Sequence, residues 1–183
     1  MCLILFSYQT HPKYSLILAA NRDEYYNRPT EPLAFWNDRP DILAGRDLKR
    51  KGVWLGITRT GRICAITNFR EPFLRIESAP SRGLLVSDFL AGQESPEFYL
   101  NQIKQVGNRY NGYNLLAGDR SGLYYYSNQA NAVQKLTAGL YGLSNHFLNT
   151  PWPKVKKGKA ALEALLEKKE EINTEDIFDI LNE

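Results

Sequence analysis

Cysteine 2 is the residue of this chain whose position is best suited to chemistry. It follows the initiator methionine directly and begins an apolar run that continues to Phe6. Removal of Met1 would give one residue both a thiol and a free α-amine, and an unperturbed α-amine with a pKa of about 7.7 to 8.0 accepts a proton near neutral pH. The position therefore predicts a nucleophile that carries its own base. A small residue at position 2 is also compatible with no catalytic role.

Polar side chains that could support acyl transfer at Cys2 follow other apolar segments of the chain. Asn68 and Asn145 are candidate oxyanion donors, because a carboxamide donates hydrogen bonds without titrating. Asp23 would hold the terminal amine, and Arg22 would fix that carboxylate or bind an anionic substrate. Each has a structural alternative, since asparagine at a strand end often caps a turn and Arg22 with Asp23 often forms a local ion pair.

The elements that must position these residues begin with strands. Apolar runs predict two neighbouring strands at 2–8 and 14–20, and both are apolar at nearly every position, which predicts cover on both faces. A plainer hairpin is predicted at 53–67, and turn residues separate four later strands at 113–117, 122–127, 133–137 and 140–144. Residues 25–50 show neither the helical nor the strand periodicity of apolar residues and are predicted to form a long loop.

Helix signals interrupt and follow these strands. Ser81 is predicted to cap a helix that ends at Gly92, and Ser95 with Pro96 begins a second one. A third helix is predicted from 151 to about 171, where Gly158 would let another element approach closely, and Thr174 caps a fourth. Strands, helices, strands and helices in this order predict an α+β protein, or a layered αββα one.

Composition argues against several classes of protein. The 183 residues carry 23 basic and 20 acidic side chains, so the net charge of +3 does not indicate a nucleic-acid partner. No run approaches the roughly 20 apolar residues of a membrane span, and the start lacks a leader pattern, so we expect a cytoplasmic chain without an integral membrane segment. Cys2 and Cys64 are expected to be reduced, with Cys64 packed in the core.

The sequence also gives no support for a metal or a nucleotide. His11 and His146 lack metal-ligand spacing, and there is no glycine-rich phosphate loop, so we expect no metal and no cofactor. The densest positive cluster is most simply the solvated face of a helix, although contact with a phosphate or an anionic lipid is the alternative. Its members are Lys154, Lys156, Lys157 and Lys159.

Taken in order, short blocks of uncommon residues make the chain resemble the NRDE family, whose eukaryotic members are the transport and Golgi organisation proteins. These blocks extend from residue 1 to about 155. They are Met1-Cys2, Leu18 to Tyr25, Arg28-Pro29, Phe35-Trp36, Trp54 to Ile57, Thr67-Asn68, Tyr110 to Leu115, Tyr141 to Asn145 and Thr150 to Trp152.

The family is similar, more distantly, to N-terminal nucleophile hydrolases such as bile-salt hydrolase and penicillin V acylase. The resemblance implies a four-layer αββα sandwich of two antiparallel sheets between helices, with the nucleophile at the head of the first strand. It implies one NRDE domain over residues 1–183. Because such proteins usually run longer, we expect the domain to be incomplete at its C-terminus, which would leave a strand edge or a helix layer uncovered.

The same resemblance assigns roles to residues of this chain. Cys2 matches the processed N-terminal cysteine, Asp23 the aspartate after the second strand, Asn68 the asparagine of an Asn-Phe segment, and Asn145 that of a Thr-Asn segment, which here reads Ser-Asn. Where those hydrolases carry an arginine three residues before the aspartate, this chain has Ala20. Residues assigned to substrate binding are Arg22, Asn21, Trp54, Tyr113 and Asn114.

Two functions follow from this sequence. The first is an N-terminal cysteine hydrolase that cleaves a small, non-peptide C–N amide after removal of Met1. The second is a non-catalytic binding or trafficking protein linked to secretory organisation, which would hold haem or a lipid-like ligand against an aromatic rim of Trp36, Trp54 and Tyr113. Fold-level analogy does not decide between them.

Overall fold

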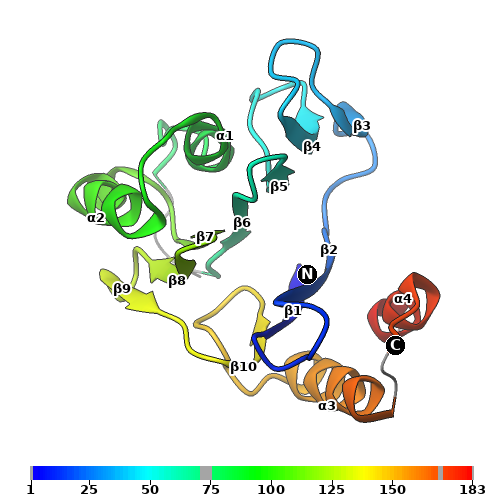
Figure 1. Cartoon of the computed structure of the whole chain (residues 1–183). Coiled ribbons are helices and arrows are strands. Elements are labelled where there is room, and N and C mark those ends of the chain that lie inside the picture. Colours follow the sequence, from blue (N-terminus) through cyan, green and yellow to red (C-terminus); the bar gives the residue numbers. More distant parts are fainter. Residues whose placement is uncertain (1, 71–75, 169–170, 183) are drawn as a thin grey trace. The chain divides into compact units, whose positions relative to one another are not determined.

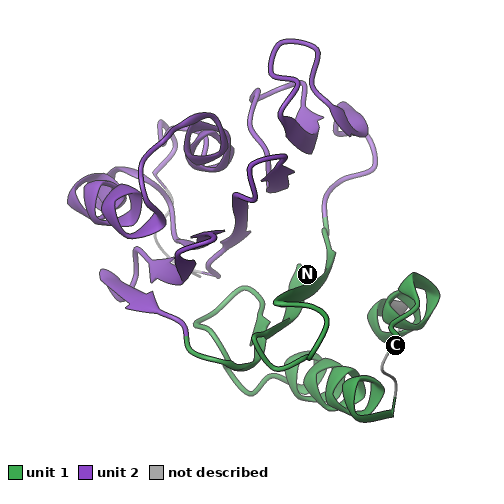
Figure 2. Ribbon diagram, in the orientation of Figure 1, with its two compact units in different colours: residues 1–23, 137–183 green, residues 24–136 purple. Residues whose placement is uncertain are grey.

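The chain divides into two compact units in the computed structural model, which describes residues 2–70, 76–168 and 171–182. Unit 1 contains residues 1–23 and 137–183, and unit 2 contains residues 24–136 (Figure 2). Each unit has an antiparallel sheet and a pair of helices, which confirms the α+β class and the two antiparallel sheets.

Unit 1 has a three-stranded sheet in the order β10-β1-β2. The strands are β1 (Leu3–Tyr8), β2 (Leu16–Asn21) and β10 (Gly139–Leu143). Two helices, α3 (Pro153–Lys168) and α4 (Thr174–Asn182), contact this sheet and each other (Figure 1). The central strand is the N-terminal one, so the start of the chain is held by partners on both sides.

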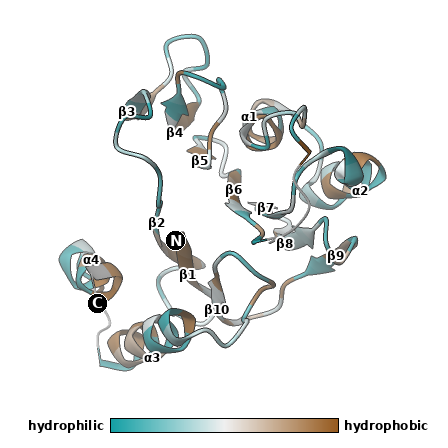
Figure 3. Cartoon of the chain, turned by 180° about the vertical axis from the view of Figure 1, so that it is seen from behind, coloured by the Kyte–Doolittle hydropathy of each residue, from teal (hydrophilic) through white to brown (hydrophobic). Residues whose placement is uncertain are grey.

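The core of unit 1 fixes which way the side chains of β1 point. Leu3 and Leu5 pack with Val155 and Leu162 of α3. Because neighbouring strand residues point to opposite faces, Ile4 and its even-numbered neighbours lie on the face away from α3. β1 is buried on both faces, as predicted, and its ribbon is strongly apolar in Figure 3. β2 only alternates between buried and half-buried residues, because it is an edge strand.

Unit 2 has a seven-stranded sheet in sequence order from β3 to β9. Helices α1 (Gly83–Ala91) and α2 (Pro96–Val106) contact it, and a short 3-10 helix spans Gly107–Arg109. Its core includes Cys64, which is fully buried as predicted. The strands are β3 (Thr30–Phe35), β4 (Ile42–Asp47), β5 (Leu55–Thr58), β6 (Ile63–Asn68), β7 (Tyr113–Asp119), β8 (Gly122–Ser127) and β9 (Ala132–Lys135).

The prediction of a long loop over residues 25–50 is wrong. This segment contains the hairpin of β3 and β4, with Thr30 paired to Asp47 and Phe35 to Leu43. β3 is exposed at every position because it is the edge strand of the sheet, so it lacks the alternation of apolar and polar residues that marks a half-buried strand. A register irregularity between Glu31 and Ala34 further masks the pattern.

The helix starts were predicted with mixed success. Ser95 caps α2 by accepting a hydrogen bond from the N–H of Phe98 at 3.3 Å, as its position before proline predicts. Ser81 does not cap α1, which begins at Gly83 after an Arg82 without a side-chain cap. The carbonyl of Ser81 instead accepts a hydrogen bond from Leu84 at 3.2 Å.

Gly158 on α3 provides a test of how the sheet of unit 1 is packed. A Cβ at this position would lie 2.5 Å from Cδ1 of Leu5, which confirms that glycine allows the close approach of helix and strand. We expect Gly158→Val to lower the free energy of unfolding by about 2 kcal/mol in urea denaturation, through overpacking. Ala160→Val, on the exposed side of the same helix, should change it by less than about 0.5 kcal/mol. Equal stability of the two variants would contradict this packing.

Candidate active site at the start of β1

The pairing of β1 brings several sequence-predicted residues to one end of the three-stranded sheet. Leu3 pairs with Asn21 of β2, so the next position along the ladder sets Cys2 opposite Arg22. On the other side Ile4 pairs with Leu143, and the same register continued sets Cys2 level with Asn145.

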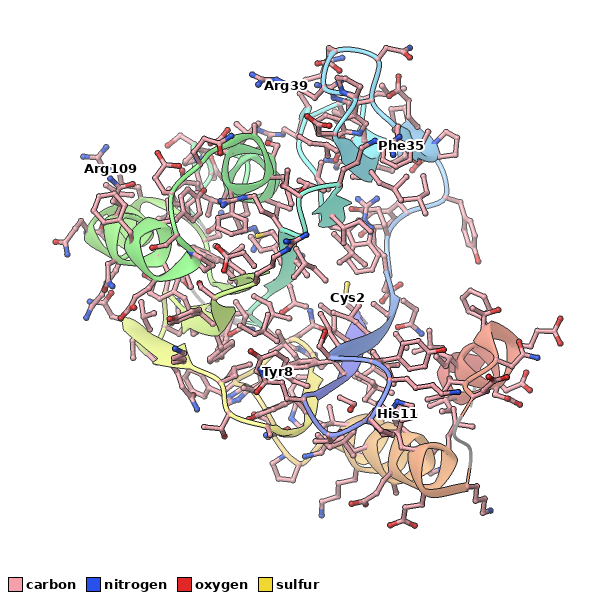
Figure 4. The ribbon with its side chains drawn as sticks, in the orientation of Figure 1. Cys2, Tyr8, His11, Phe35, Arg39 and Arg109 are labelled. Atoms are coloured by element: carbon pink, nitrogen blue, oxygen red, sulfur yellow. The ribbon has the colours of Figure 1, made fainter. Side chains whose placement is uncertain are left out.

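The thiol of Cys2 lies on the face of β1 away from α3. Figure 4 shows the sulfur at the start of the strand, pointing away from that helix. The residue is half-buried and not part of a disulfide.

The carbonyl of Cys2 is held by two side chains. Ser144 Oγ donates to it at 2.7 Å, and Lys154 Nζ donates to it at 2.9 Å. Ser144 follows β10 and Lys154 lies in the first turn of α3, so both partners come from elements that pack on β1. This clamp fixes the backbone of residue 2 beyond the last pair of the β ladder.

Asp23 is tied to the terminal amine. The pKa of its carboxyl is lowered by a hydrogen bond from the α-ammonium group at the start of the chain and by that group's charge, with a further contribution from Lys154. In the unprocessed chain this amine belongs to Met1, which lies outside the described residues. The role predicted for Asp23, to hold the α-ammonium group of Cys2, stays a prediction.

Lys154 is the site residue that sequence reasoning missed. Burial lowers its pKa, while Cys2 and Asp23 act in the opposite direction. Its Nζ also lies 5.8 Å from the centroid of the Trp152 ring. The lysine cluster of 154–159 hides it in the sequence, and only its place in the first turn of α3, directly after Trp152-Pro153, could have marked it. It supplies a positive charge beside Cys2.

Asn145 is nine-tenths buried at the same end of the sheet. Its Oδ1 lies 3.3 Å from Ser144 Oγ, the hydroxyl that contacts the Cys2 carbonyl. With the amide oxygen turned toward Ser144, the amide NH₂ group points away from it. Asn145 therefore remains the oxyanion donor proposed from this unit.

The other predicted residues belong to unit 2. Asn68 ends β6 opposite Tyr113, and its part in a site with Cys2 stays a prediction. Asn114 is fully buried within a polar network, because its Nδ2 donates to Thr67 Oγ1 at 3.2 Å and its Oδ1 accepts from Tyr125 at 2.7 Å. These bonds use both ends of the amide, which makes Asn114 a fixed part of the sheet.

The three residues of the predicted aromatic rim are buried or half-buried in unit 2. Tyr113 is fully buried in the core of unit 2, and Trp36 is also buried, with its Nε1 donating to the carbonyl of Ala44 at 3.1 Å. Trp54 packs half-buried against the same core. The prediction failed because large aromatic side chains in alternating strands serve packing more often than ligand binding.

Unit 1 contains a cleft on the opposite face of the sheet from Cys2. It has a volume of about 200 Å³ and combines apolar walls with two lysines. Asn21, predicted to bind substrate, lines this cleft and donates to the carbonyl of Leu181 in α4 at 3.3 Å. It therefore faces the helices, as its pairing with Leu3 requires. The remaining lining residues are Leu3, Lys154, Lys157, Gly158, Ala161, Ile180 and Leu181.

Among residues 2–70, 76–168 and 171–182, no group of three or more His, Cys, Asp or Glu residues is placed to hold a metal ion. Within the same ranges, every helix is too short or too polar to span a bilayer.

The setting of Cys2 predicts how its thiol reacts. We expect Lys154→Met to slow alkylation of Cys2 by iodoacetamide at pH 7 about 3- to 10-fold, because Lys154 and Cys2 interact electrostatically. Mass spectrometry should show one alkylated cysteine per native chain, since burial raises the pKa of the Cys64 thiol and keeps it protonated. Lys156→Met, an exposed position on the same helix, is the control and should react like the wild type. An unchanged rate for Lys154→Met would contradict the proximity of its charge to the sulfur.

The solved structure of a Caenorhabditis elegans N-acylethanolamine-hydrolyzing acid amidase ortholog is similar in fold to this chain. The TM-score is 0.52 at 8% sequence identity, and the match covers 100% of this chain and 86% of that one. A likeness at this identity shows the fold alone, which is that of an N-terminal nucleophile hydrolase.

Sequence relatives give the family. A mouse Transport and Golgi organization 2 homolog is 39% identical over 199 residues, and the human homolog is 38% identical over the same length. Both matches cover the whole of this chain and 72% of the relative. The model of the family described as Transport and Golgi organisation 2 matches residues 1–183. The chain therefore belongs to the Transport and Golgi organisation 2 family.

Proposed function

We propose that this protein is an N-terminal cysteine hydrolase that cleaves a small, non-peptide C–N amide after removal of Met1. The observation that carries the proposal is the clamp on the Cys2 carbonyl by Ser144 and Lys154. It holds residue 2 in line with β1, where Arg22, Asp23 and Asn145 also lie.

Chemistry would begin with the sulfur of Cys2. Its thiol proton passes to its own α-amine while the sulfur attacks the amide carbon, which gives a tetrahedral intermediate with a negative oxygen. The C–N bond then breaks, and the α-ammonium group returns the proton to the leaving amine. The resulting thioester is hydrolysed by water, which restores the thiol and releases the acid.

The remaining residues have supporting roles in this scheme. Asn145 donates to the oxyanion. Asp23 orients the α-amine of Cys2 once Met1 is gone. Arg22 and Lys154 bind an anionic group of the substrate. The amide class is taken from the amidase of similar fold, and a cytoplasmic location stays a prediction.

The first experiment measures processing and hydrolysis together. Intact-mass analysis of the purified chain should give a mass lower by one methionine residue, because the mechanism needs the α-amine of Cys2. Released amine should then be detected from a panel of short N-acyl amides. Cys2→Ala should reduce the rate at least 10³-fold, and Asn145→Ala about 10²- to 10³-fold through loss of an oxyanion donor.

Cys64→Ala is the matched control, because it removes the other cysteine from the core without touching the site, and it should retain activity in the fraction that folds. A chain that keeps Met1 yet hydrolyses amides would refute the amine as the base. A processed chain that hydrolyses none of the amides would refute the amidase itself.

The cleft of unit 1 favours the second candidate function, which is the binding of a lipid-like ligand without catalysis. Its apolar walls suit an acyl chain, and Lys154 and Lys157 suit an anionic head. Haem has less support than a lipid, since the aromatic rim proposed to hold it lies in the core of unit 2.

A filling substitution tests this candidate. We expect Ala161→Trp, within the cleft, to weaken binding of a fluorescent long-chain carboxylate more than tenfold by occupying its volume, whereas Cys2→Ala on the opposite face leaves the affinity unchanged. An absorbance titration with haemin is run alongside. Absence of binding by both probes would remove this function, and a haemin shift alone would restore the haem version.

A further inference from the structure

The turn that follows β4 concentrates positive charge at one end of unit 2. Lys49, Arg50 and Lys51 are consecutive and exposed. Within residues 2–70, 76–168 and 171–182, none of the three forms an ion pair. Their charges therefore face solvent without compensation from a bonded carboxylate. We call residues 48–51 the basic turn.

Asp47 stabilises the backbone of the basic turn and does not neutralise the charges of its side chains. Its Oδ1 accepts hydrogen bonds from the N–H groups of Lys49 and Arg50, each at 2.9 Å. Its Oδ2 accepts from Nε and Nη2 of Arg28, at 3.0 and 2.6 Å. Burial alone would raise the pKa of Asp47, but these hydrogen bonds outweigh it and lower the pKa. The carboxylate stays charged and is committed to Arg28 and the backbone.

Lys51 occupies a backbone conformation that is unusual for lysine. Its φ angle is +57°, in the left-handed region where glycine or asparagine fits with less strain. The N–H of Lys51 donates to the carbonyl of Asp47 at 2.8 Å, which holds this conformation in place. The turn therefore retains a third cation at a position where glycine would stabilise the fold better.

A second turn beside the basic turn exposes aromatic side chains. Tyr25 is 82% exposed and Tyr26 is fully exposed. The N–H of Arg28 donates to the carbonyl of Tyr25 at 2.9 Å within this turn. The N–H of Leu48 donates to the carbonyl of Pro29 at 3.0 Å, which joins the two turns. Leu48 is itself 37% exposed. We call residues 25–28 the tyrosine turn.

We propose that the basic turn and the tyrosine turn together dock this protein on an anionic lipid surface. Uncompensated lysine and arginine side chains are attracted to anionic headgroups, and tyrosine partitions to the interface between headgroups and acyl chains. An acidic protein or a nucleic acid would satisfy the three cations but not two exposed tyrosines and a leucine on neighbouring turns. Two acidic groups near these turns are engaged by hydrogen bonds, Asp47 as above and Glu24, which accepts from the N–H of Tyr25 at 3.0 Å. The proposal is independent of the hydrolase function.

Vesicle co-sedimentation tests the proposal with the whole 183-residue chain. We expect binding to phosphatidylcholine vesicles that contain about one third phosphatidylserine, and little binding to phosphatidylcholine alone. Lys49→Glu, Arg50→Glu and Lys51→Glu combined should weaken it about 100-fold, at roughly fivefold for each basic side chain lost near the surface. In 500 mM salt, which screens the charges, the combined Tyr25→Ser and Tyr26→Ser substitutions should weaken the remaining binding to the vesicles.

The matched control reverses the same number of charges outside the two turns. Lys156→Glu, Lys168→Glu and Arg120→Glu are exposed substitutions that change the net charge equally, and this variant should bind like the wild type. Equal loss in both variants, or loss in the control alone, would overturn the assignment to the basic turn. Binding to a duplex oligonucleotide as tight as to the vesicles would show a general polyanion site and contradict lipid docking. Circular dichroism confirms that each variant is folded.

Discussion

The central place of β1 between β2 and β10 is the constraint on which the candidate site depends. Both ladders set residue 2 level with particular neighbours, and a slip of one residue in either ladder would turn Cys2 toward α3. The slip is opposed by Leu3 and Leu5, which pack on α3, and by the close approach of that helix at Gly158. Apolar packing on one face of the strand thus determines which groups meet the sulfur on the other.

Much of this arrangement could be predicted from the sequence, because the relevant strands are short, apolar and bounded by turn residues. The positions of β1, β2 and β10 followed from that pattern. Two features could not be predicted. The hairpin of β3 and β4 lies at an exposed edge without periodicity, and Lys154 is chemically indistinguishable in sequence from the solvated lysines beside it.

The lysines of α3 show how tertiary position separates residues of one type. Lys154 lies in the first turn, where its ammonium reaches the Cys2 carbonyl, and Lys159 donates to Asn149 at 3.0 Å. Lys156 and Lys157 are exposed. The basic turn of unit 2 is a different case, since its organising carboxylate is occupied by Arg28 and the turn's own backbone. The hydrogen-bond partners of a charged side chain therefore indicate its role better than the density of charged residues along the sequence does.

The central claim is that Cys2 is a nucleophile for acyl groups, and the most direct measurement is trapping of the acyl-enzyme. The chain would be mixed briefly with an activated acyl ester, quenched in acid and mapped by peptide mass spectrometry. The account predicts one acyl group as a hydroxylamine-sensitive thioester on Cys2, at the mature N-terminus. Acylation confined to lysine side chains, or a Cys2 that stays unmodified while amide is hydrolysed, would contradict it.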